Sequence, residues 1–374
     1  EDWQEEKITL TFATWAYTDD TMVTIDYVMA EEFMKKYPNI TIEFQIVGEE
    51  YDYETNLLAL METNELPDVY LVRRMETLLP NNMLADITEM YENDEDTKYI
   101  FDSLQTSGMF DGRRYAVPTY IYPEFWCVNK TLLSSKNIPI PSYDWTWDQM
   151  ENIAKQAADS SQHILGLYGR QGYYGESGTR VYTYNLPKVL KLASDKAAGS
   201  KWAAKSFDGT KFNYMDDAFL NAMNKLTAGI NAGWIQTELS AEQKLEYYND
   251  ETFIPTTGGK TAIWFEPSWS FKDQFNNFSF EWDVYPGPSG VSGGNTDIAG
   301  VSSLCKHKKA AYQFLKWMSY SEEGILARFK IYEESGSELY QQGNNYPYPI
   351  VDYGIDANGV NKIWSSIPYG DTAP

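Results

Sequence analysis

The chain has 374 residues, enough for one large or two medium domains, and its 54 Asp and Glu against 30 Lys and Arg give a net charge of −24. This charge repels a phosphate backbone, so it argues against broad nucleic-acid binding. The sequence has no run of about eighteen apolar residues, so it predicts no membrane-spanning helix.

Cysteine and histidine are scarce. The chain has two of each, Cys127 and Cys305 with His163 and His307, and they form no CxxC or HExxH pattern. We therefore expect no metal site and no cofactor, while the pairing of the two cysteines stays open. The polar first residues, 1–7, fit a start left after removal of an export signal or lipid anchor, and they fit a shortened chain equally well.

The first structured segments predict a parallel α/β sheet. Apolar residues alternate with threonine over 8–14, which indicates a strand, and then recur every three or four positions from Met22 to Phe33, which indicates a helix that Pro38 ends. Alternation over 40–46 predicts a second strand. Strand, helix and strand at this spacing form a βαβ unit with parallel strands and a right-handed crossover.

A third strand is predicted at 68–72, after a helical stretch near 54–61. Ligands on open α/β sheets bind beyond the carboxyl ends of the strands. The residues that follow the three predicted strands are Trp15 and Tyr17, then Glu49, Glu50 and Tyr51, then Arg73 and Arg74.

The middle and end of the chain mix helices and strands. Residues 146–149 (TWDQ) form a capping box, in which Thr146 caps a helix and Gln149 reaches back to it. Further helices are predicted at 219–230, with Gly233 as the stop, and at 311–318. Strands are predicted at 261–265 and 282–286. The acidic run 92–96 lacks the glycine of a calcium loop, so we expect a solvated loop.

Two tests for functional motifs fail, and a third decides nothing. Residues 259–261 (GKT) resemble the end of a phosphate-binding loop, but Ile254 stands at its first glycine and a strand follows where a helix is needed. No G-x-S-x-G elbow is present. Paired carboxylates for glycoside hydrolysis carry no specificity among 54 acids, so they leave a glycan-active enzyme as an open alternative.

Aromatic side chains gather near charged residues at predicted strand ends. Tyr120, Tyr122 and Trp126 bracket Glu124, Tyr173 lies between glycines, and Trp264, Glu266 and Trp269 fall within six residues. A sugar offers apolar C–H faces that stack on flat rings, and hydroxyl groups that need fixed donors and acceptors. Rings beside carboxylates at loop positions meet both needs, although any single ring can equally belong to the core.

Three segments, in order, resemble a known family. They are 111–118 (DGRRYAVP), 128–133 (VNKTLL) and 145–150 (WTWDQM), supported by 258–263 (GGKTAI) and 309–317 (KAAYQFLKW). Their order and spacing are similar to those of the extracellular solute-binding proteins of carbohydrate ABC importers, the group that includes maltose-binding protein. The likeness runs from Ile8 to about Ser321, and residues after about Gly336 match no family pattern, so their role stays open.

The resemblance implies an α/β fold of two lobes with a ligand cleft between them and three crossings, near 117–122, 262–266 and 301–306. On that basis we expect residues 1–118 with 264–303 in an N-terminal lobe and 119–263 with 304–374 in a C-terminal lobe. The lobes are expected to close on the ligand by hinge motion.

The resemblance also implies the function. We expect an extracytoplasmic protein, lipid-anchored or periplasmic, that acts as a monomer and delivers a carbohydrate to the permease subunits of an ABC importer without catalysis. The alternatives are the glycan-active enzyme and a binder of a non-sugar solute on the same fold.

Many aromatics favour an oligosaccharide, and Arg73 and Arg74 leave room for a uronate-containing one. The expected ligand-binding residues, among which Trp269 is the best candidate for stacking, are Trp15, Glu49, Arg73, Arg74, Tyr120, Tyr122, Glu124, Tyr173, Trp264, Glu266, Trp269 and Asp297.

Overall fold

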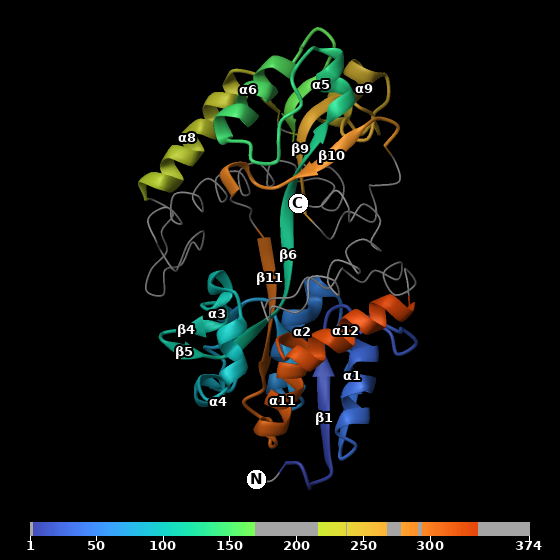
Figure 1. The fold of residues 1–374 in the computed structure, drawn as a ribbon. Helices are drawn as coiled ribbons and strands as arrows, with labels where there is room; N and C mark the ends of the chain where they lie inside the picture. Colours follow the sequence, from blue (N-terminus) through green and yellow to red (C-terminus); the bar gives the residue numbers. More distant parts are fainter. Residues whose placement is uncertain (1–2, 169–215, 237, 268–277, 291–293, 336–374) are drawn as a thin grey trace. The chain divides into compact units, whose positions relative to one another are not determined.

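The computed structural model describes residues 3–168, 216–236, 238–267, 278–290 and 294–335 (Figure 1). They form two compact units. Unit 1 contains the described residues up to Ile121 and from Thr296 onward, and unit 2 those from Tyr122 to Asn295. Among the described residues the chain therefore passes between units twice, at Ile121–Tyr122 and at Asn295–Thr296. The first of these passages lies within the crossing expected at 117–122.

Unit 1 is built on a sheet with strand order β2-β1-β3-β11-β6. Strand β1 runs parallel to β2 and β3, so the predicted βαβ start is confirmed, and β11 runs antiparallel to β3. The elements of unit 1 are β1 (Ile8–Ala13), α1 (Ile25–Lys36), β2 (Ile40–Phe44), α2 (Glu50–Glu62), β3 (Val69–Val72), α3 (Met75–Leu78), α4 (Thr88–Glu92), η1 (Glu95–Tyr99), η2 (Asp102–Leu104), β4 (Met109–Phe110), β5 (Arg113–Arg114), the first half of β6 (Ala116–Asn129), most of β11 (Gly294–Val301), α11 (Lys308–Ser319) and α12 (Glu322–Ser335).

Helices α1, α11 and α12 pack together in unit 1 (Figure 1). The ring of Phe314 meets those of Phe12 and Phe33 at 5.3 and 5.1 Å, and the indole of Trp317 donates a hydrogen bond to the Met29 carbonyl at 2.9 Å. The chain runs from β1 out to β2 and returns past β1 to β3. Right-handed crossovers therefore place α1 and α2 on opposite faces of the sheet.

Local chemistry sets the ends of the first helix. The Thr24 hydroxyl accepts a hydrogen bond from the Tyr27 amide at 3.2 Å, so it caps α1, and the helix ends at Lys36, before Pro38. Met22, which the apolar spacing included, lies before the helix. Helix α2 starts four residues earlier than the predicted stretch 54–61, with Glu49 at its N-cap position.

The expectation of a solvated acidic loop at 92–96 is wrong for Asp94. Its carboxylate accepts hydrogen bonds from the Lys316 ammonium and the Tyr320 hydroxyl, both at 2.7 Å, and Asp96 lies 2.7 Å from the same ammonium. Burial opposes the charge on Lys316, but these two carboxylates outweigh it and raise the pKa of the lysine. The run therefore attaches α11 to the segment that follows α4.

Unit 2 has strand order β10-β6-β9-β7-β8, with β6 antiparallel to both β9 and β10 and with β7 parallel to β9 and β8. The elements of unit 2 are the second half of β6, α5 (Lys130–Ser135), α6 (Trp147–Ala157), β7 (Leu165–Tyr168), α8 (Asp217–Asn231), β8 (Ile235–Gln236), α9 (Ala241–Tyr248), β9 (Thr261–Pro267), β10 (Trp282–Tyr285) and η5 (Pro288–Gly290).

The predicted helix signals of unit 2 are confirmed. The Thr146 amide donates to the Gln149 side chain at 2.7 Å and the Gln149 amide donates to the Thr146 hydroxyl at 3.2 Å, so α6 begins with the capping box. Helix α8 ends just before Gly233, whose φ of +80° suits glycine. A second capping box, Ser240 with Gln243, starts α9, with serine in the place that threonine takes in the first box.

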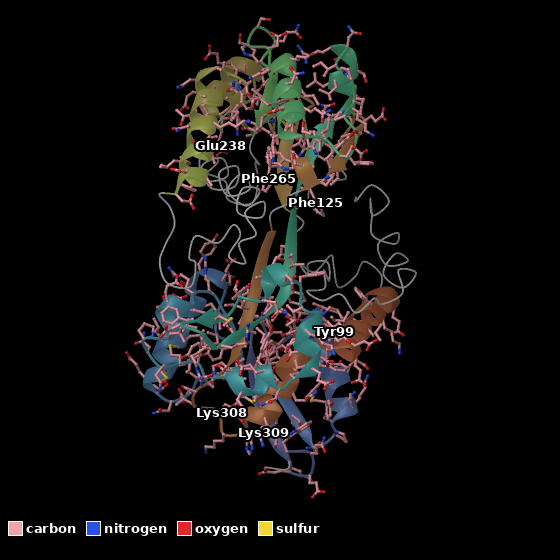
Figure 2. All side chains as sticks on the ribbon, turned by 60° about the vertical axis from the view of Figure 1, so that its left-hand side comes forward. Tyr99, Phe125, Glu238, Phe265, Lys308 and Lys309 are labelled. Carbon is pink, nitrogen blue, oxygen red and sulfur yellow. The ribbon has the colours of Figure 1, made fainter. Side chains whose placement is uncertain are left out.

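Both faces of the unit 2 sheet are buried. Phe265 packs in one apolar cluster with residues of α6 and α8, and Phe125 packs in another with Trp264 and Val284 (Figure 2). Neighbouring residues of a strand point to opposite faces, so both Trp264 and Phe265 of β9 are core residues.

The two units divide the chain differently from the expected lobes. Strand β9, expected partly in the N-terminal lobe, pairs with β6 and β7 inside unit 2. Helices α11 and α12, expected in the C-terminal lobe, pack on α1 in unit 1. The segments expected to cross at 262–266 and 301–306 therefore each lie within one unit, and the second passage is at 295–296.

The two cysteines lie in different units. Cys127 is in β6 within unit 2 and Cys305 is in unit 1, both are buried, and no disulfide joins them. In the part of the chain that the structure describes, the helices are all too short or too polar to cross a membrane.

Candidate functional site

The carboxyl ends of the parallel strands bring six predicted residues to one end of the unit 1 sheet. Because β1, β2 and β3 are parallel, the segments that follow them share one edge. Strand β11 is antiparallel to β3, and its pairing of Ile298 with Val72 continues to Asp297 beside Arg73. We call this set the unit 1 edge: Trp15, Glu49, Arg73, Arg74, Tyr120 and Asp297.

Trp15 is a half-buried ring held at the start of this edge. It meets Tyr53 of α2 edge-to-face, with ring centroids 5.5 Å apart and an angle of 89° between planes. The buried Tyr53 hydroxyl donates to the Ala13 carbonyl at 3.0 Å, and burial raises the pKa of Tyr53. The tryptophan is therefore supported on a side chain that is itself fixed to the end of β1, and part of its surface stays open to solvent.

The turn after Trp15 is also fixed. The Thr14 hydroxyl accepts from the Ala16 amide at 3.1 Å and the Thr14 carbonyl accepts from the Tyr17 amide at 3.2 Å. The Tyr17 ring packs against Phe44 at 4.6 Å. Tyr17, although it follows a predicted strand, is a core residue, and burial raises the pKa of its hydroxyl.

The two arginines after β3 each pair with a glutamate of α2. Arg74 makes a fork, with Nε donating to Glu54 Oε2 at 3.2 Å and Nη2 lying 3.0 Å from Oε1. Glu54 is 6% exposed, so this arginine neutralises a buried carboxylate. Arg73 donates through Nη1 to the Glu50 carbonyl at 2.5 Å, and its Nη2 lies 3.5 Å from Glu50 Oε1.

Tyr120 of β6 joins three elements of unit 1. Its hydroxyl donates to Asp26 Oδ1 of α1 at 2.6 Å, and the Arg328 guanidinium of α12 lies over its ring at 4.4 Å. The Tyr120 carbonyl accepts from the Thr296 hydroxyl at 2.5 Å, and the Asp297 carbonyl accepts from the Thr119 hydroxyl at 3.2 Å. The hydroxyl and one ring face of Tyr120 thus contact protein atoms.

Sequence reasoning missed Glu50, Glu54, Asp26 and Arg328 as members or supports of this edge. Glu50 follows the second predicted strand, and Glu54 lies four residues further along α2, one helical turn away. Arg328 sits among apolar residues of α12 and is 5% exposed. A buried arginine in a helix signals a partner, but the sequence gives no sign of where on the chain that partner lies.

The remaining predicted residues belong to unit 2, and the structure describes the side chains of two of them, Trp264 and Tyr122. Trp264 is 1% exposed, and its ring packs against Phe278 at 5.5 Å and Trp282 at 6.2 Å. We correct its assignment from ligand stacking to the core. Tyr122 is 9% exposed, so its surface is also largely covered.

Glu124 and Glu266 lie on the paired strands β6 and β9. Glu124 pairs with Pro267, and Phe125 pairs with Glu266. The positions of the two glutamate side chains are outside what the structure describes. Tyr173 and Trp269 are also outside the described residues. Among the described residues there is no group of three or more His, Cys, Asp or Glu that could hold a metal ion.

A family model of bacterial extracellular solute-binding proteins matches residues 15–324. One solved structure with the same fold is an ABC substrate-binding protein of Listeria monocytogenes in complex with cycloalternan; the match has 20% identity and a TM-score of 0.61 and covers 99% of this chain and 84% of that one. Another is a sugar transporter of Rhizobium etli in an open conformation, with 16% identity, a TM-score of 0.65, and coverage of 96% of this chain and 82% of that one. A third, UgpB of Mycobacterium tuberculosis, is in complex with glycerophosphocholine (14% identity, TM-score 0.62, 98% and 85%).

Proposed function

The chain belongs to the bacterial extracellular solute-binding proteins, and on that premise we propose that it captures a carbohydrate, in the first instance an oligosaccharide, for an ABC importer. The observation that carries the proposal is the unit 1 edge, where the Trp15 ring lies at the same sheet end as two arginine–glutamate pairs. The ring offers a flat apolar surface for C–H groups, and the carboxylates and guanidinium groups offer acceptors and donors for hydroxyls.

The proposal includes the setting of this activity. The protein acts outside the cytoplasm, either lipid-anchored or free in a periplasm, as a monomer that hands its ligand to permease subunits. Hinge closure of the two units accompanies binding, because a ligand with higher affinity for the closed form shifts the population toward it. Binding is the whole activity and no bond of the ligand is broken.

The decisive experiment is calorimetry with a panel of neutral oligosaccharides, preceded by a thermal-shift screen. Saturable binding is expected for at least one member, and replacing Trp15 by Ala should weaken it by about 1–3 kcal/mol, the loss of a ring contact at a binding site. Trp3→Ala is the matched control. Trp3 packs on Tyr37 near the start of β1, at the opposite end of that strand from Trp15.

An unchanged affinity in Trp15→Ala would remove the unit 1 edge from the binding site. Cleaved products after incubation with the same oligosaccharides would instead support the glycan-active enzyme. A non-sugar solute is the second candidate, favoured by the fold neighbour that holds glycerophosphocholine. The screen therefore includes glycerophosphodiesters, and binding of these in place of every sugar would replace carbohydrate as the ligand class.

A further inference from the structure

Two arginines at the unit 1 edge are of the residue type that binds an anionic ligand. Arginine forks match carboxylates and phosphates, and Arg73 and Arg74 follow β3 directly. Their existing partners decide what they can do. Each is already matched with a glutamate of α2, Arg73 with Glu50 and Arg74 with Glu54.

The Arg74 pair is the tighter of the two. Both carboxylate oxygens of Glu54 are used, one at 3.2 Å from Nε and one at 3.0 Å from Nη2, and the Glu54 side chain is 8% exposed whereas that of Arg74 is 58% exposed. An incoming carboxylate that took over this fork would leave a buried charge without its partner, which is strongly unfavourable. The fork of Arg74 is therefore committed to Glu54.

The Arg73 pair uses the start of α2 as well as a side chain. One guanidinium nitrogen binds the Glu50 carbonyl at 2.5 Å and another lies 3.5 Å from the Glu50 carboxylate. The guanidinium also lies 5.5 Å from the centre of the Tyr51 ring. Three groups thus hold this arginine in place, and the charge that it carries is balanced by Glu50.

Further carboxylates lie in the segments that lead into the same edge of the sheet. The segments that follow β1 and β2, residues 14–24 and 45–54, contain two and four Asp or Glu respectively, so six in total, and no Lys or Arg. Beyond Glu50 and Glu54 these are Asp19, Asp20, Glu49 and Asp52, and all four are exposed. With Asp26, Asp297 and Arg328 included, three arginines stand against eight carboxylates, which leaves a negative field at this edge that repels anions over about a Debye length of 8–10 Å.

We propose that the unit 1 edge selects against anionic ligands, with Glu50 and Glu54 as the specificity-determining residues that keep Arg73 and Arg74 from binding a carboxylate or phosphate. The inference rests on the proposed function and sharpens it. The ligand portion at this edge is an uncharged sugar or one that carries an amino group, and a uronate is excluded.

The test uses matched ligands on the intact chain. Maltotriose and cellotriose are compared with their C6-oxidised uronate forms and with glycerol phosphate, by calorimetry at 20 mM and 500 mM salt. At low salt each neutral trisaccharide should bind at least about tenfold more tightly than its uronate form. High salt should reduce this ratio of affinities several-fold, because it screens the repulsion between the uronate and the carboxylates.

Substitution of Glu50 and Glu54 tests whether these two glutamates cause the preference for the neutral ligand. Glu50→Gln and Glu54→Gln should each reduce the ratio of the affinity for the neutral trisaccharide to that for its uronate by about threefold to tenfold. Glu62→Gln is the matched control, since Glu62 is the exposed last residue of α2, at the opposite end of the helix. Glu50 is half-exposed, so Glu50→Gln folds even if loss of the buried charge in Glu54→Gln disturbs the structure.

The outcomes separate this inference from the proposed function. A uronate that binds as tightly as its neutral partner, or a ratio unchanged in both glutamine variants, overturns the inference and leaves carbohydrate capture standing. Glycerol phosphate that binds when none of the sugars does overturns both. A neutral preference that weakens in the two variants and in salt, but not in Glu62→Gln, supports the assignment.

Discussion

The two units treat their aromatic residues in opposite ways. In unit 1, Trp15 lies beyond the end of β1, where its ring packs edge-to-face on Tyr53 and is only half-buried. In unit 2, Trp264 stands within a strand that has neighbours on both sides and apolar clusters on both faces, so its ring is buried. Position relative to the strand end, more than residue type, separates a candidate ligand contact from a core residue.

Replacing Trp264 by Ala is the most severe way to test this contrast. Removal of a fully buried indole should cost about 3–5 kcal/mol of unfolding free energy, measured by urea denaturation. If the alanine variant does not fold, Trp264→Phe should give a smaller but measurable loss. Trp15→Ala is the comparison, and it should lose less stability because its ring is half-exposed. Equal losses at the two positions would break the distinction between edge and core.

Replacing Tyr53 by Phe tests whether the edge depends on its support. The change removes the hydroxyl that binds the Ala13 carbonyl and should cost about 1 kcal/mol of stability. Carbohydrate affinity should also fall, because Trp15 loses a fixed neighbour. Tyr91→Phe, which loses a 2.9 Å hydrogen bond to the Gln105 side chain, is the control and should leave affinity unchanged. Full affinity in Tyr53→Phe would mean that Trp15 is positioned by other contacts.

The two capping boxes of unit 2 offer a finer comparison. Helix α6 buries Met150, Ile153, Ala154 and Ala157, whereas α9 buries none of its residues fully. Thr146→Ala should therefore cost about 1 kcal/mol of unfolding free energy, because the start of α6 cannot fray without exposing core. Ser240→Ala should cost less than about 0.5 kcal/mol, since α9 can fray at its first turn. Similar losses in thermal or urea unfolding would contradict this account.

The smallest expected effect concerns the Cys305 thiol of unit 1. Burial, with Asp68 nearby, raises its pKa from the ordinary 9.0 to about 12. The folded state keeps the proton while the unfolded state releases it, so this group's contribution to stability is full below pH 9 and falls as the pH rises toward 12. Alkylation by iodoacetamide at pH 9.5, mapped by peptide mass spectrometry, should be slow in the native protein and fast in urea. Rapid native labelling would contradict the burial.

Much of unit 1 could be predicted because its signals are local. Alternation over 8–14 and 40–46 predicts strands that the structure places at 8–13 and 40–44, and apolar spacing predicts the helix before Pro38. The rule that ligands meet the carboxyl ends of parallel strands then places Trp15, Glu49, Arg73 and Arg74 together. The pairing of Arg74 with Glu54 was not visible, because it joins a strand end to a helix turn 20 residues away.

The errors share one physical cause, which is contact between distant segments. Strand β9 was divided between lobes because its pairing with β6 and β7 leaves no mark in its own residues. Helix α11 has the same amphipathic pattern whichever unit it covers, and only contacts such as Trp317 with Met29 decide. Asp94 read as solvated because its partners, Lys316 and Tyr320, lie more than two hundred residues later.

The return of the chain to unit 1 after Asn295 has a consequence for synthesis. A ribosome releases β1, β2 and β3 first, yet β11, which pairs with β3, and Phe314, which packs on Phe12 and Phe33, are made only after the described residues of unit 2. The described residues of unit 2 all fall between Tyr122 and Asn295, so they are present earlier. A nascent chain thus carries the first half of unit 1 without these later partners until residue 314 has been made.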